Sequence, residues 1–329
     1  MAKNRTRITG IGSALTDILI NETDDFLINL QKEKGGMTIV QDKDIQNILS
    51  YSNQNKKPIV VCGGASCNTI IGVAKLGGKA RFIGMRGEDS YGKIFEDNLI
   101  KSNVEPLISI SDTSTGKVLS VITPDGQRSM FTFLGASALL LPDMIKPEMF
   151  ENTAIALIEG YLLFNPNLIM AALKAAKKAG CLIALDLASF EIVNASKKIL
   201  KNIVKNFVDI LIANEDEAKA YTGFEDEINA LKSLSLNVDY AVLKLGAKGS
   251  LIMFDNKITR VEAFKGKNPI VDTTGAGDLW ASGFLFGIAN GLNIEKSGYI
   301  ASACGYEVCQ VIGAQVPDSA WARIKNLRY

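Results

Sequence analysis

The sequence contains no histidine among its 329 residues. This absence excludes catalytic triads built on histidine, histidine metal ligands and proton transfer through imidazole. A general base in this chain must therefore be a carboxylate, Lys, Cys or Tyr side chain.

The chain also lacks an excess of either charge and a long hydrophobic run. Lys and Arg together number 36 and Asp and Glu together 35, so the net charge does not favour nucleic acid or an anionic membrane surface. No segment approaches the roughly 18 apolar residues of a membrane span. Asp17 interrupts the first apolar stretch, which is therefore not a signal sequence. We expect a soluble, cytoplasmic protein.

Cysteine is scarce as well. The chain has five, an odd number, and no two of them have C-x-x-C spacing. This pattern suits buried thiols in a reducing compartment better than disulfides or zinc ligands. Hydrophobic residues make up 47% of the chain, which is close to the globular average and sufficient for a sizeable core.

Short apolar runs alternate with helical patterns along most of the chain. This order predicts a three-layer α/β/α fold around a mostly parallel sheet. The expected strands are 58–62, 80–83, 154–158, 181–185, 208–212 and 240–243, and the expected helices are 66–76, 90–101, 167–179 and 195–206.

The region 118–134 breaks this alternation. Two extended runs, 118–123 and 128–134, flank a turn signal at 124–127, which predicts a hairpin. The segment 36–40 is expected to add a strand to it. We expect one large α/β domain across 1–329, with a small β-sheet lid drawn from about 14–50 and 104–135. The lid would stand over the carboxyl edge of the main sheet, where ligands bind in open α/β folds.

Two glycine motifs fail as nucleotide signatures. Gly10 and Gly12 begin like a dinucleotide fingerprint, but the third glycine is missing. Gly87 to Lys93 has the spacing of a P-loop, yet Ile94 stands where a P-loop needs Ser or Thr for magnesium.

The segment 272–278 is a stronger candidate for chemistry, because it reads Asp-Thr-Thr-Gly-Ala-Gly-Asp and leads into an apolar helical pattern. Gly275, Ala276 and Gly277 are small enough for backbone N–H groups at a helix start to converge on an anion. Asp278 falls in the first helical turn, where the helix dipole favours its ionised form. It is placed to take a proton from a hydroxyl group. The simpler alternative is a glycine-rich loop with an Asp at the helix start.

A second glycine pair precedes the expected helix 66–76. Gly63 and Gly64 permit close backbone approach to a ligand, and Asn68 offers a donor and an acceptor to a polyol. An ordinary strand-to-helix turn explains the same residues. Asp17 ends the first extended run, 8–20, and is either exposed at a turn or aimed at ligand hydroxyls.

Two further patterns each allow two interpretations. Asn214 and Glu217 have the spacing of a helix capping box, or Glu217 holds Mg²⁺ through water near the phosphates. Arg128, Met130 and Leu134 share one face of the second hairpin strand. That face offers apolar surface to a purine and an Arg to a phosphate, or it packs against the other lid strand.

Together these motifs resemble those of the ribokinase-like, or PfkB, carbohydrate and nucleoside kinases. The segment from Gly63 through Gly92 is similar to one family signature, and 272–278 is similar to the second. Asn214 and Glu217 match a further element. The resemblance covers essentially the whole chain and implies the ribokinase-like α/β fold with a β lid.

The resemblance implies roles for the acceptor side and for the base. Asp278 would deprotonate the acceptor hydroxyl beside an anion hole. Asp17, Gly64 and Asn68 would hold sugar hydroxyls. ATP and Mg²⁺ are the implied cofactors, and many relatives also use K⁺, bound near the loops before 272 and after 313.

On the nucleotide side, the resemblance implies that Asn214 and Glu217 organise magnesium and phosphate. Gly246 and Gly249 are expected to approach the nucleotide phosphates. Lys244, at the start of the same loop, is also expected on the phosphate and nucleotide side, although it stands where many relatives have Thr.

Within the family, the segments 37–40, 133–137 and 159–162 look most like bacterial adenosine kinases. We therefore expect transfer of the γ-phosphoryl group of ATP to the 5′-hydroxyl of adenosine. A free-sugar kinase acting on fructose or ribose is the first alternative, and a non-catalytic ligand sensor is the second. We expect no nucleic-acid or membrane partner. The protein is expected to be a monomer or a homodimer, and an exposed apolar lid face would favour the homodimer.

Overall fold

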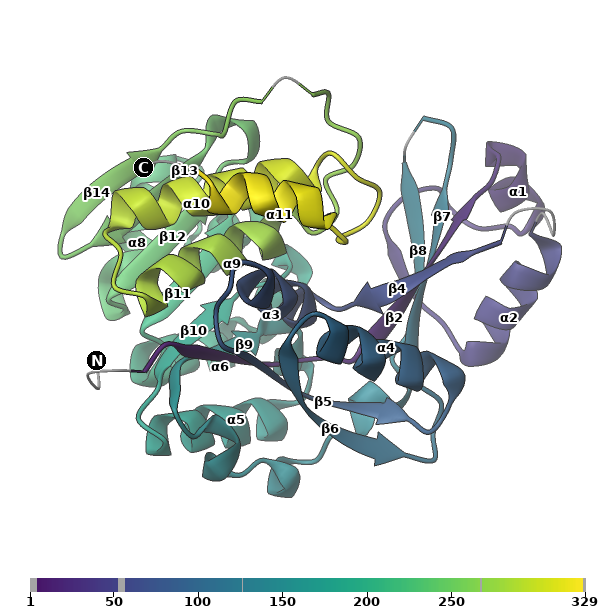
Figure 1. Cartoon of the computed structure of the whole chain (residues 1–329), viewed down its shortest axis with the longest axis horizontal. Coiled ribbons are helices and arrows are strands. Elements are labelled where there is room, and N and C mark those ends of the chain that lie inside the picture. The colour runs from purple at the N-terminus through teal and green to yellow at the C-terminus, as the bar shows by residue number, and fades with distance from the viewer. Residues whose placement is uncertain (1–4, 53–56, 126, 267, 328–329) are drawn as a thin grey trace.

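The computed structural model describes residues 5–52, 57–125, 127–266 and 268–327. Its strands form two sheets, one of nine strands and one of five. Figure 1 shows the larger sheet with its helices on the left and the smaller sheet on the right.

The larger sheet is mostly parallel, as the alternation of strand and helix predicts. Its order is β14-β13-β12-β11-β10-β9-β1-β5-β6, and the pairings that involve β13 are antiparallel. Continuous apolar runs form its central strands because both faces of the sheet are covered. The nine strands of the sheet are β1 (Arg7–Ile11), β5 (Ala80–Gly87), β6 (Val104–Ser111), β9 (Thr153–Glu159), β10 (Leu182–Asp186), β11 (Ile210–Asn214), β12 (Tyr240–Lys244), β13 (Ser250–Phe254) and β14 (Lys257–Val261).

Helices cover both faces of this sheet, so the predicted three-layer architecture is confirmed. One apolar core lies under α3 (Ala65–Lys75), α4 (Ser90–Lys101), α9 (Ala276–Ala289) and α10 (Ile294–Val308). A second core lies under α5 (Pro166–Lys178), α6 (Phe190–Phe207), α7 (Glu215–Thr222) and α8 (Glu227–Leu234). The last helix, α11 (Asp318–Lys325), packs with α9 and α10 in a third cluster.

The smaller sheet has the order β3-β8-β7-β2-β4. It consists of β2 (Leu15–Asn21), β3 (Met37–Ile39), β4 (Ile59–Gly63), β7 (Gly116–Ile122) and β8 (Arg128–Phe133). The predicted hairpin is confirmed, because β7 and β8 pair antiparallel, and β3 adds to β8 as expected. Residue 126 of the predicted turn lies outside the described residues.

One face of the smaller sheet is covered by the helices α1 (Asp24–Asn29) and α2 (Asp42–Tyr51). Leu119 and Phe131 of the sheet share a core with Leu27 of α1 and Ile45 of α2. Alternation along β7 and β8 sends their other side chains to the opposite face. Asp17 of β2, which pairs with Val118 of β7, therefore lies on the face opposite α1 and α2.

The structure corrects three boundaries. The extended run 8–20 is two strands, β1 and β2, which lie in different sheets, so Asp17 lies within β2 and not at the end of a single run. The range 104–135 contains β6, which pairs parallel with β5 in the larger sheet because α4 provides a strand–helix–strand crossover. The strand β4 lies outside the expected lid ranges, yet it pairs antiparallel with β2 in the smaller sheet.

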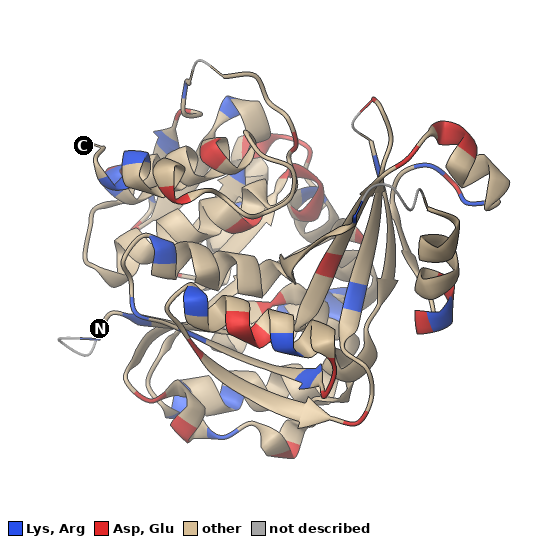
Figure 2. Ribbon diagram, turned by 45° about the vertical axis from the view of Figure 1, so that its right-hand side comes forward, with Lys and Arg blue, Asp and Glu red and all other residues tan. Residues whose placement is uncertain are grey.

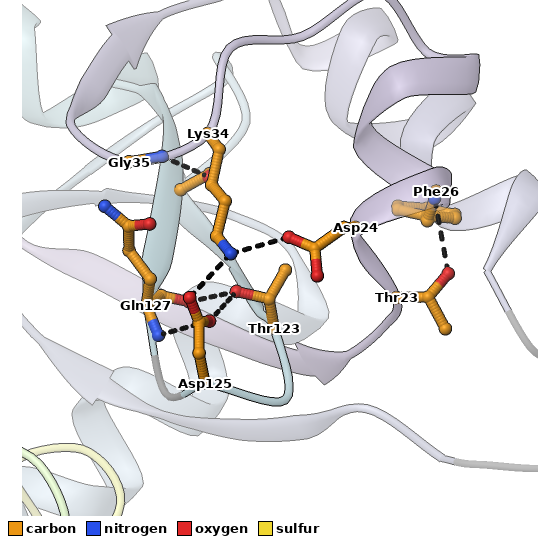
Figure 3. A network of polar contacts seen from close by, with 9 residues as sticks. Thr23, Asp24, Phe26, Lys34, Gly35, Thr123, Asp125 and Gln127 are labelled. Atoms are coloured by element: carbon orange, nitrogen blue, oxygen red, sulfur yellow. Dashed lines mark hydrogen bonds and ion pairs between the residues drawn. The ribbon is translucent and has the colours of Figure 1, made fainter.

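Polar contacts tie the segment after α1 to the turn between β7 and β8 (Figure 3). Lys34 Nζ lies 2.6 Å from Asp24 Oδ1 and 2.7 Å from Asp125 Oδ2. The Lys34 ammonium, with hydrogen bonds from Thr123 and Gln127, holds the pKa of the Asp125 carboxyl well below its usual range. These contacts fix the hairpin end relative to α1.

Charged positions of both signs are interspersed over the two parts of the molecule (Figure 2), in line with the near-zero net charge. No helix in the described ranges is both long enough and apolar enough to cross a membrane.

Candidate active site

Polar side chains end four neighbouring strands of the larger sheet. Glu159 ends β9, Asp186 ends β10, Asn214 ends β11 and Lys244 ends β12. The strands are parallel and in register, with Glu159 opposite Asp186 and Asn214 opposite Lys244. The carboxyl edge of an open parallel sheet is where such folds bind ligands.

The start of α9 lies at this edge, as the sequence predicts. Gly275 is the N-cap residue with φ +74°, a left-handed conformation that glycine adopts without steric cost. A Cβ at Gly275 would also lie 2.8 Å from Ala314 Cβ. Leu279 N donates to Gly275 O and Ala276 N donates to Thr273 O, which leaves the amides of Gly277 and Asp278 as the first-turn donors that face the helix N-terminus.

Asn68 and Asp278 are 210 positions apart and meet at this point. Asn68 Nδ2 donates to Asp278 Oδ2 at 3.0 Å, and Thr69 Oγ1 donates to the Asp278 carbonyl at 3.1 Å. Close packing of α3 on α9 makes these contacts possible. A Cβ at Gly72 would lie 2.5 Å from Ser282 Oγ, so only glycine permits this helix separation.

Burial raises the pKa of Asp278 to about 6. The hydrogen bond from Asn68 and the charge of Lys244 lower this pKa, while the charge of Asp186 raises it. At neutral pH the carboxyl group is therefore mainly ionised. A pKa just below the working pH suits a general base, because the group is free of its proton yet basic enough to accept one.

Gly63 and Gly64 are required by the packing around Asp17. A Cβ at Gly63 would lie 2.2 Å from Asp17 Oδ1, and one at Gly64, whose φ is +95°, would lie 2.5 Å from the Ser13 carbonyl. The two glycines thus let the chain enter α3 directly beneath the Asp17 side chain. This packing explains why glycine occupies both positions. Contact of the two glycines with substrate stays a prediction.

Asp17 belongs to the face of the smaller sheet opposite α1 and α2. In register it lies opposite Val61 and Val118, and Val118 lies opposite Thr132. Burial raises the pKa of Asp17 to about 7, the Arg128 charge lowers it and the Asp278 charge raises it. Arg128 of the same face forms an ion pair with Asp272, so this face looks toward the loop before α9.

Met130 lies on the same face as Asp17, since it is opposite Ser120, which is opposite Leu19. Leu134 does not lie on that strand face, because β8 ends at Phe133 and Leu134 begins the following turn. The expected alternation is therefore wrong at its last residue. A short helical segment, η1 (Gly135–Leu139), takes over there.

Arg128 ties the smaller sheet to the loop before α9. Its guanidinium forms an ion pair with Asp272 Oδ2, which also accepts a hydrogen bond from Gly313 N at 2.7 Å. Asp272 Oδ1 accepts from Thr274 N at 3.0 Å. Asp272 therefore holds the loop before α9 against the chain near 313 and against the smaller sheet. The expected contact of Arg128 with phosphate stays a prediction.

On the far side of Asp278, Lys244 forms a partly buried ion pair. Its Nζ lies 3.1 Å from Asp186 Oδ2. The loop that follows begins with Gly246, which has φ +53° and open space at its Cβ position. A Cβ at Gly249 would lie 2.0 Å from the Val261 carbonyl, so strand packing explains that glycine.

Comparison with known proteins agrees with this geometry. Residues 38–321 match the pfkB family carbohydrate kinase profile. The chain belongs to this family. It is 32% identical over 270 residues to a probable fructokinase-7 from Arabidopsis thaliana, which covers 74% of this chain and 76% of the relative.

Solved structures of the family superpose over nearly the full chain. A probable sugar kinase from Rhizobium etli has a TM-score of 0.88 and 28% identity, with 98% of each chain covered. The adenosine kinase from Sinorhizobium meliloti has a TM-score of 0.86 and 29% identity, with 97% of this chain and 99% of that chain covered. The protein is thus a PfkB-family kinase and a phosphotransferase, and kinases of this family use ATP and a divalent metal.

Glu217, the residue expected to hold Mg²⁺ through water, lies at this edge as the third residue of α7, and its role in metal binding stays a prediction. Asn214 N donates to Glu217 Oε2 at 2.9 Å and Glu217 N donates to Asn214 Oδ1 at 2.9 Å, so the predicted capping box is present. In the described ranges no group of three or more Asp, Glu, Cys or His side chains is arranged to hold a metal. Mg²⁺ usually keeps several waters and takes one or two carboxylates plus substrate phosphates.

Sequence reasoning missed two acidic residues of this edge. Glu159 is buried and its Oε2 accepts a hydrogen bond from Ser66 N at 3.1 Å. Burial raises the pKa of Glu159 to about 7. Asp186 forms the ion pair with Lys244. The signal for both was available, because each charged residue directly follows an apolar strand that the alternation predicts.

Proposed function

We propose that this kinase transfers the γ-phosphoryl group of ATP to the 5′-hydroxyl of adenosine and yields AMP and ADP. The observation that carries the phosphoryl transfer is Asp278 in the first turn of α9, hydrogen-bonded to Asn68 and next to the amides that follow Gly275. A carboxylate beside an anion-binding helix start has the parts that phosphoryl transfer needs.

In this mechanism, Asp278 takes the proton of the acceptor hydroxyl. The acceptor oxygen forms its bond to the γ-phosphorus while the bond from that phosphorus to the bridging oxygen of ADP breaks. The N–H groups of Gly275 and Gly277 would stabilise charge on the transferring group, whereas the Ala276 N–H, also expected in this role, already donates to Thr273 O. Asn68 orients the Asp278 carboxylate through its 3.0 Å hydrogen bond.

We assign the binding of ATP to the neighbouring strand ends of the larger sheet. Gly246 leaves open backbone beside the β12 end, where the phosphates of ATP would approach. Glu217, through water, would hold Mg²⁺, which neutralises phosphate charge when bound. K⁺ would bind where the loops at Asp272 and Gly313 meet, as many relatives have it.

Two observations support adenosine as the acceptor. The face of the smaller sheet that carries Asp17 also carries Leu19, Val61 and Met130, an apolar surface that suits a flat base. Asp17 lies among these residues and would bind ribose hydroxyls with Gly63, Gly64 and Asn68. The adenosine kinase from Sinorhizobium meliloti matches nearly the whole chain.

A free-sugar acceptor is the second candidate. It is favoured by the 32% identity to a probable fructokinase-7 and by the match to a probable sugar kinase. Fructose or ribose would use the same Asp17, Asn68 and Asp278 but leave the apolar face without a partner. A hydrophobic face that stays in contact with water gains no binding free energy.

An acceptor panel tests the proposal. ADP release is measured with ATP, Mg²⁺ and, in separate reactions, adenosine, inosine, ribose and fructose. The proposal predicts the highest kcat/KM with adenosine. Turnover of fructose or ribose without turnover of adenosine would reject adenosine but keep the kinase. Absence of ADP release above background with every acceptor would favour a ligand sensor.

A further inference from the structure

We propose that Lys244 contacts the transferring phosphoryl group, and that Asp186 is the positioning residue that holds Lys244 in place. This inference rests on the phosphoryl transfer proposed above. It gives Lys244 a catalytic role, in addition to the roles of Asp278 and of the anion-binding amides.

The ion pair joins the ends of two strands at the carboxyl edge of the larger sheet. Lys244 ends β12 and Asp186 ends β10, with β11 between them. Lys244 Nζ lies 3.1 Å from Asp186 Oδ2, and the two side chains are 14% and 17% exposed. Asp186 Oδ1 accepts a hydrogen bond from Ala188 N at 3.2 Å, so the carboxylate is itself held by the backbone.

The ammonium group lies directly against the anion-binding turn. A Cβ placed on Gly277 would be 3.1 Å from Lys244 Nζ and 3.9 Å from Lys244 Cε. Glycine at this position therefore leaves the space between the first turn of α9 and the ammonium free of side chain. An anion bound by the amides of that turn would lie next to a positive charge.

Three acidic residues lie near Lys244, and their negative charge makes its positive charge important for phosphate binding. Burial lowers the pKa of Lys244, but Asp186, Glu217 and Asp278 outweigh burial and the net shift is upward, so the ammonium stays charged. Without it, a phosphoryl group would enter a site that holds three carboxyl groups. The negative charges of these carboxyl groups and of the phosphoryl group would repel each other strongly, because the site is shielded from water.

Lysine has the chemistry for both contacts at once. Its ammonium carries three N–H donors, and one hydrogen bond to Asp186 leaves two for phosphoryl oxygens. Hydrogen bonds between charged groups are about twice as strong as neutral ones. Stabilisation grows as charge moves onto the transferring group, so the contact lowers the barrier and does more than bind ATP.

The test compares ATP with ADP, which lacks the γ-phosphoryl group. Affinities for both, with Mg²⁺ and without acceptor, are measured by calorimetry for the wild type, Lys244→Met and Lys244→Arg. Lys244→Met should weaken ATP about tenfold more than ADP, and kcat should fall about 100-fold with little change in acceptor KM. Lys244→Arg keeps the charge and should recover part of both losses.

Lys117→Met is the matched control. Lys117 Nζ lies 2.6 Å from Asp42 Oδ1 and its side chain is 7% exposed, so this variant also removes a buried lysine from an aspartate, but in β7 of the smaller sheet. It should leave the ratio of ATP to ADP affinity unchanged. Equal losses of that ratio in both variants would overturn the proposal, as would a folded Lys244→Met with the wild-type ratio or wild-type kcat.

Asp186→Asn provides a second route if Lys244→Met does not fold. It keeps the lysine and loosens its position, so the ATP preference and kcat should both fall, by about tenfold for kcat. An unchanged ATP preference would contradict the assignment. Because these affinities are measured without acceptor, they report on Lys244 even if the acceptor panel rejects adenosine.

Discussion

The start of α9 and the smaller sheet differ in how they are encoded. The first is one continuous segment, in which Gly275 to Asp278 form both the helix start and the reactive carboxylate. The second assembles its site-facing surface from three strands, so that Asp17 of β2 lies beside Val61 of β4 and Val118 of β7. In the proposed function the base and the anion-binding amides are thus local in the sequence, while acceptor selectivity would depend on long-range strand pairing.

This difference has a functional meaning. In the proposed function Asp278 would serve any alcohol acceptor placed beside it, so the α9 segment would identify the reaction and not the substrate. In the proposed function the smaller sheet would carry the information on substrate, because its strand register decides which side chains share the face with Asp17. Changes in the two regions should therefore have separable effects on kcat and on acceptor preference.

The largest effect is expected at the reactive carboxylate. Asp278→Asn removes the proton acceptor but keeps the size of the side chain, and kcat should fall about 1000-fold with acceptor binding retained. Rates are measured by ADP release and binding by calorimetry. Asp318→Asn on the exposed start of α11 is the control and should keep the wild-type rate. A similar rate in both variants would refute the role of Asp278.

The pH dependence of the rate should follow the same carboxyl group. Since the pKa of Asp278 is about 6 and the base must be ionised, kcat should decline as the pH falls through about 6. Asn68→Ala removes the hydrogen bond that lowers this pKa, so the decline should move to higher pH, with kcat reduced about tenfold.

Thr69→Val is the matched control for Asn68→Ala. The Thr69 hydroxyl donates to the carbonyl of Asp278 and not to its carboxylate. Its removal should leave the midpoint of the pH profile in place. A profile that shifts equally in both variants would mean that packing of α3, and not the hydrogen bond, sets the pKa.

Neighbouring residues on β8 allow the acceptor surface to be separated from the core. Met130 is on the face with Asp17, and Phe131 is in the core under α1 and α2. Met130→Ala should raise the KM for adenosine roughly tenfold, because a purine loses apolar contact, with little effect on the KM for ribose. Phe131→Ala should lower the free energy of unfolding by about 3 to 5 kcal/mol.

The converse pattern would contradict this division of the strand. Kinetics with both acceptors and denaturant unfolding are measured for each variant. If Met130→Ala destabilised the fold as much as Phe131→Ala and left acceptor preference unchanged, then the Met130 face would be a structural surface. The assignment of the smaller sheet to substrate selection would then fail.

The smallest effect concerns the pH dependence of stability. Burial raises the pKa of Glu159 to about 7, so between about pH 5 and 7 the folded state holds a proton that the unfolded state has released. The free energy of unfolding should therefore fall as the pH rises through this window. Glu159→Gln should reduce the difference in Tm between pH 5 and pH 8, and Glu148→Gln on the surface should not. An unchanged difference would show that Glu159 does not titrate in this window.

Much of the fold is predictable from the sequence because its signals are local. The strand–helix alternation predicts the three layers, and the turn at 124–127 predicts the hairpin of β7 and β8. The sheet to which a strand belongs is a long-range property. The pattern of β6 does not show that it pairs with β5, and the pattern of β4 does not show that it joins β2.

The candidate site follows the same rule. The segment 272–278 is recognised directly, whereas the contact between Asn68 and Asp278 depends on the packing of α3 against α9. Leu134 was misplaced because alternation along a strand does not reveal where the strand ends. The partnership of Lys244 with Asp186 crosses an intervening strand, and no local pattern predicts it.

A competition assay tests the central claim most directly. Adenosine and fructose are supplied at equal concentration in one reaction with ATP and Mg²⁺, and the two phosphorylated products are quantified by mass spectrometry. Their ratio equals the ratio of the two kcat/KM values. We predict that AMP exceeds fructose phosphate by more than about 100-fold, because a purine contributes buried apolar contact. An excess of fructose phosphate would contradict the assignment of this kinase to adenosine.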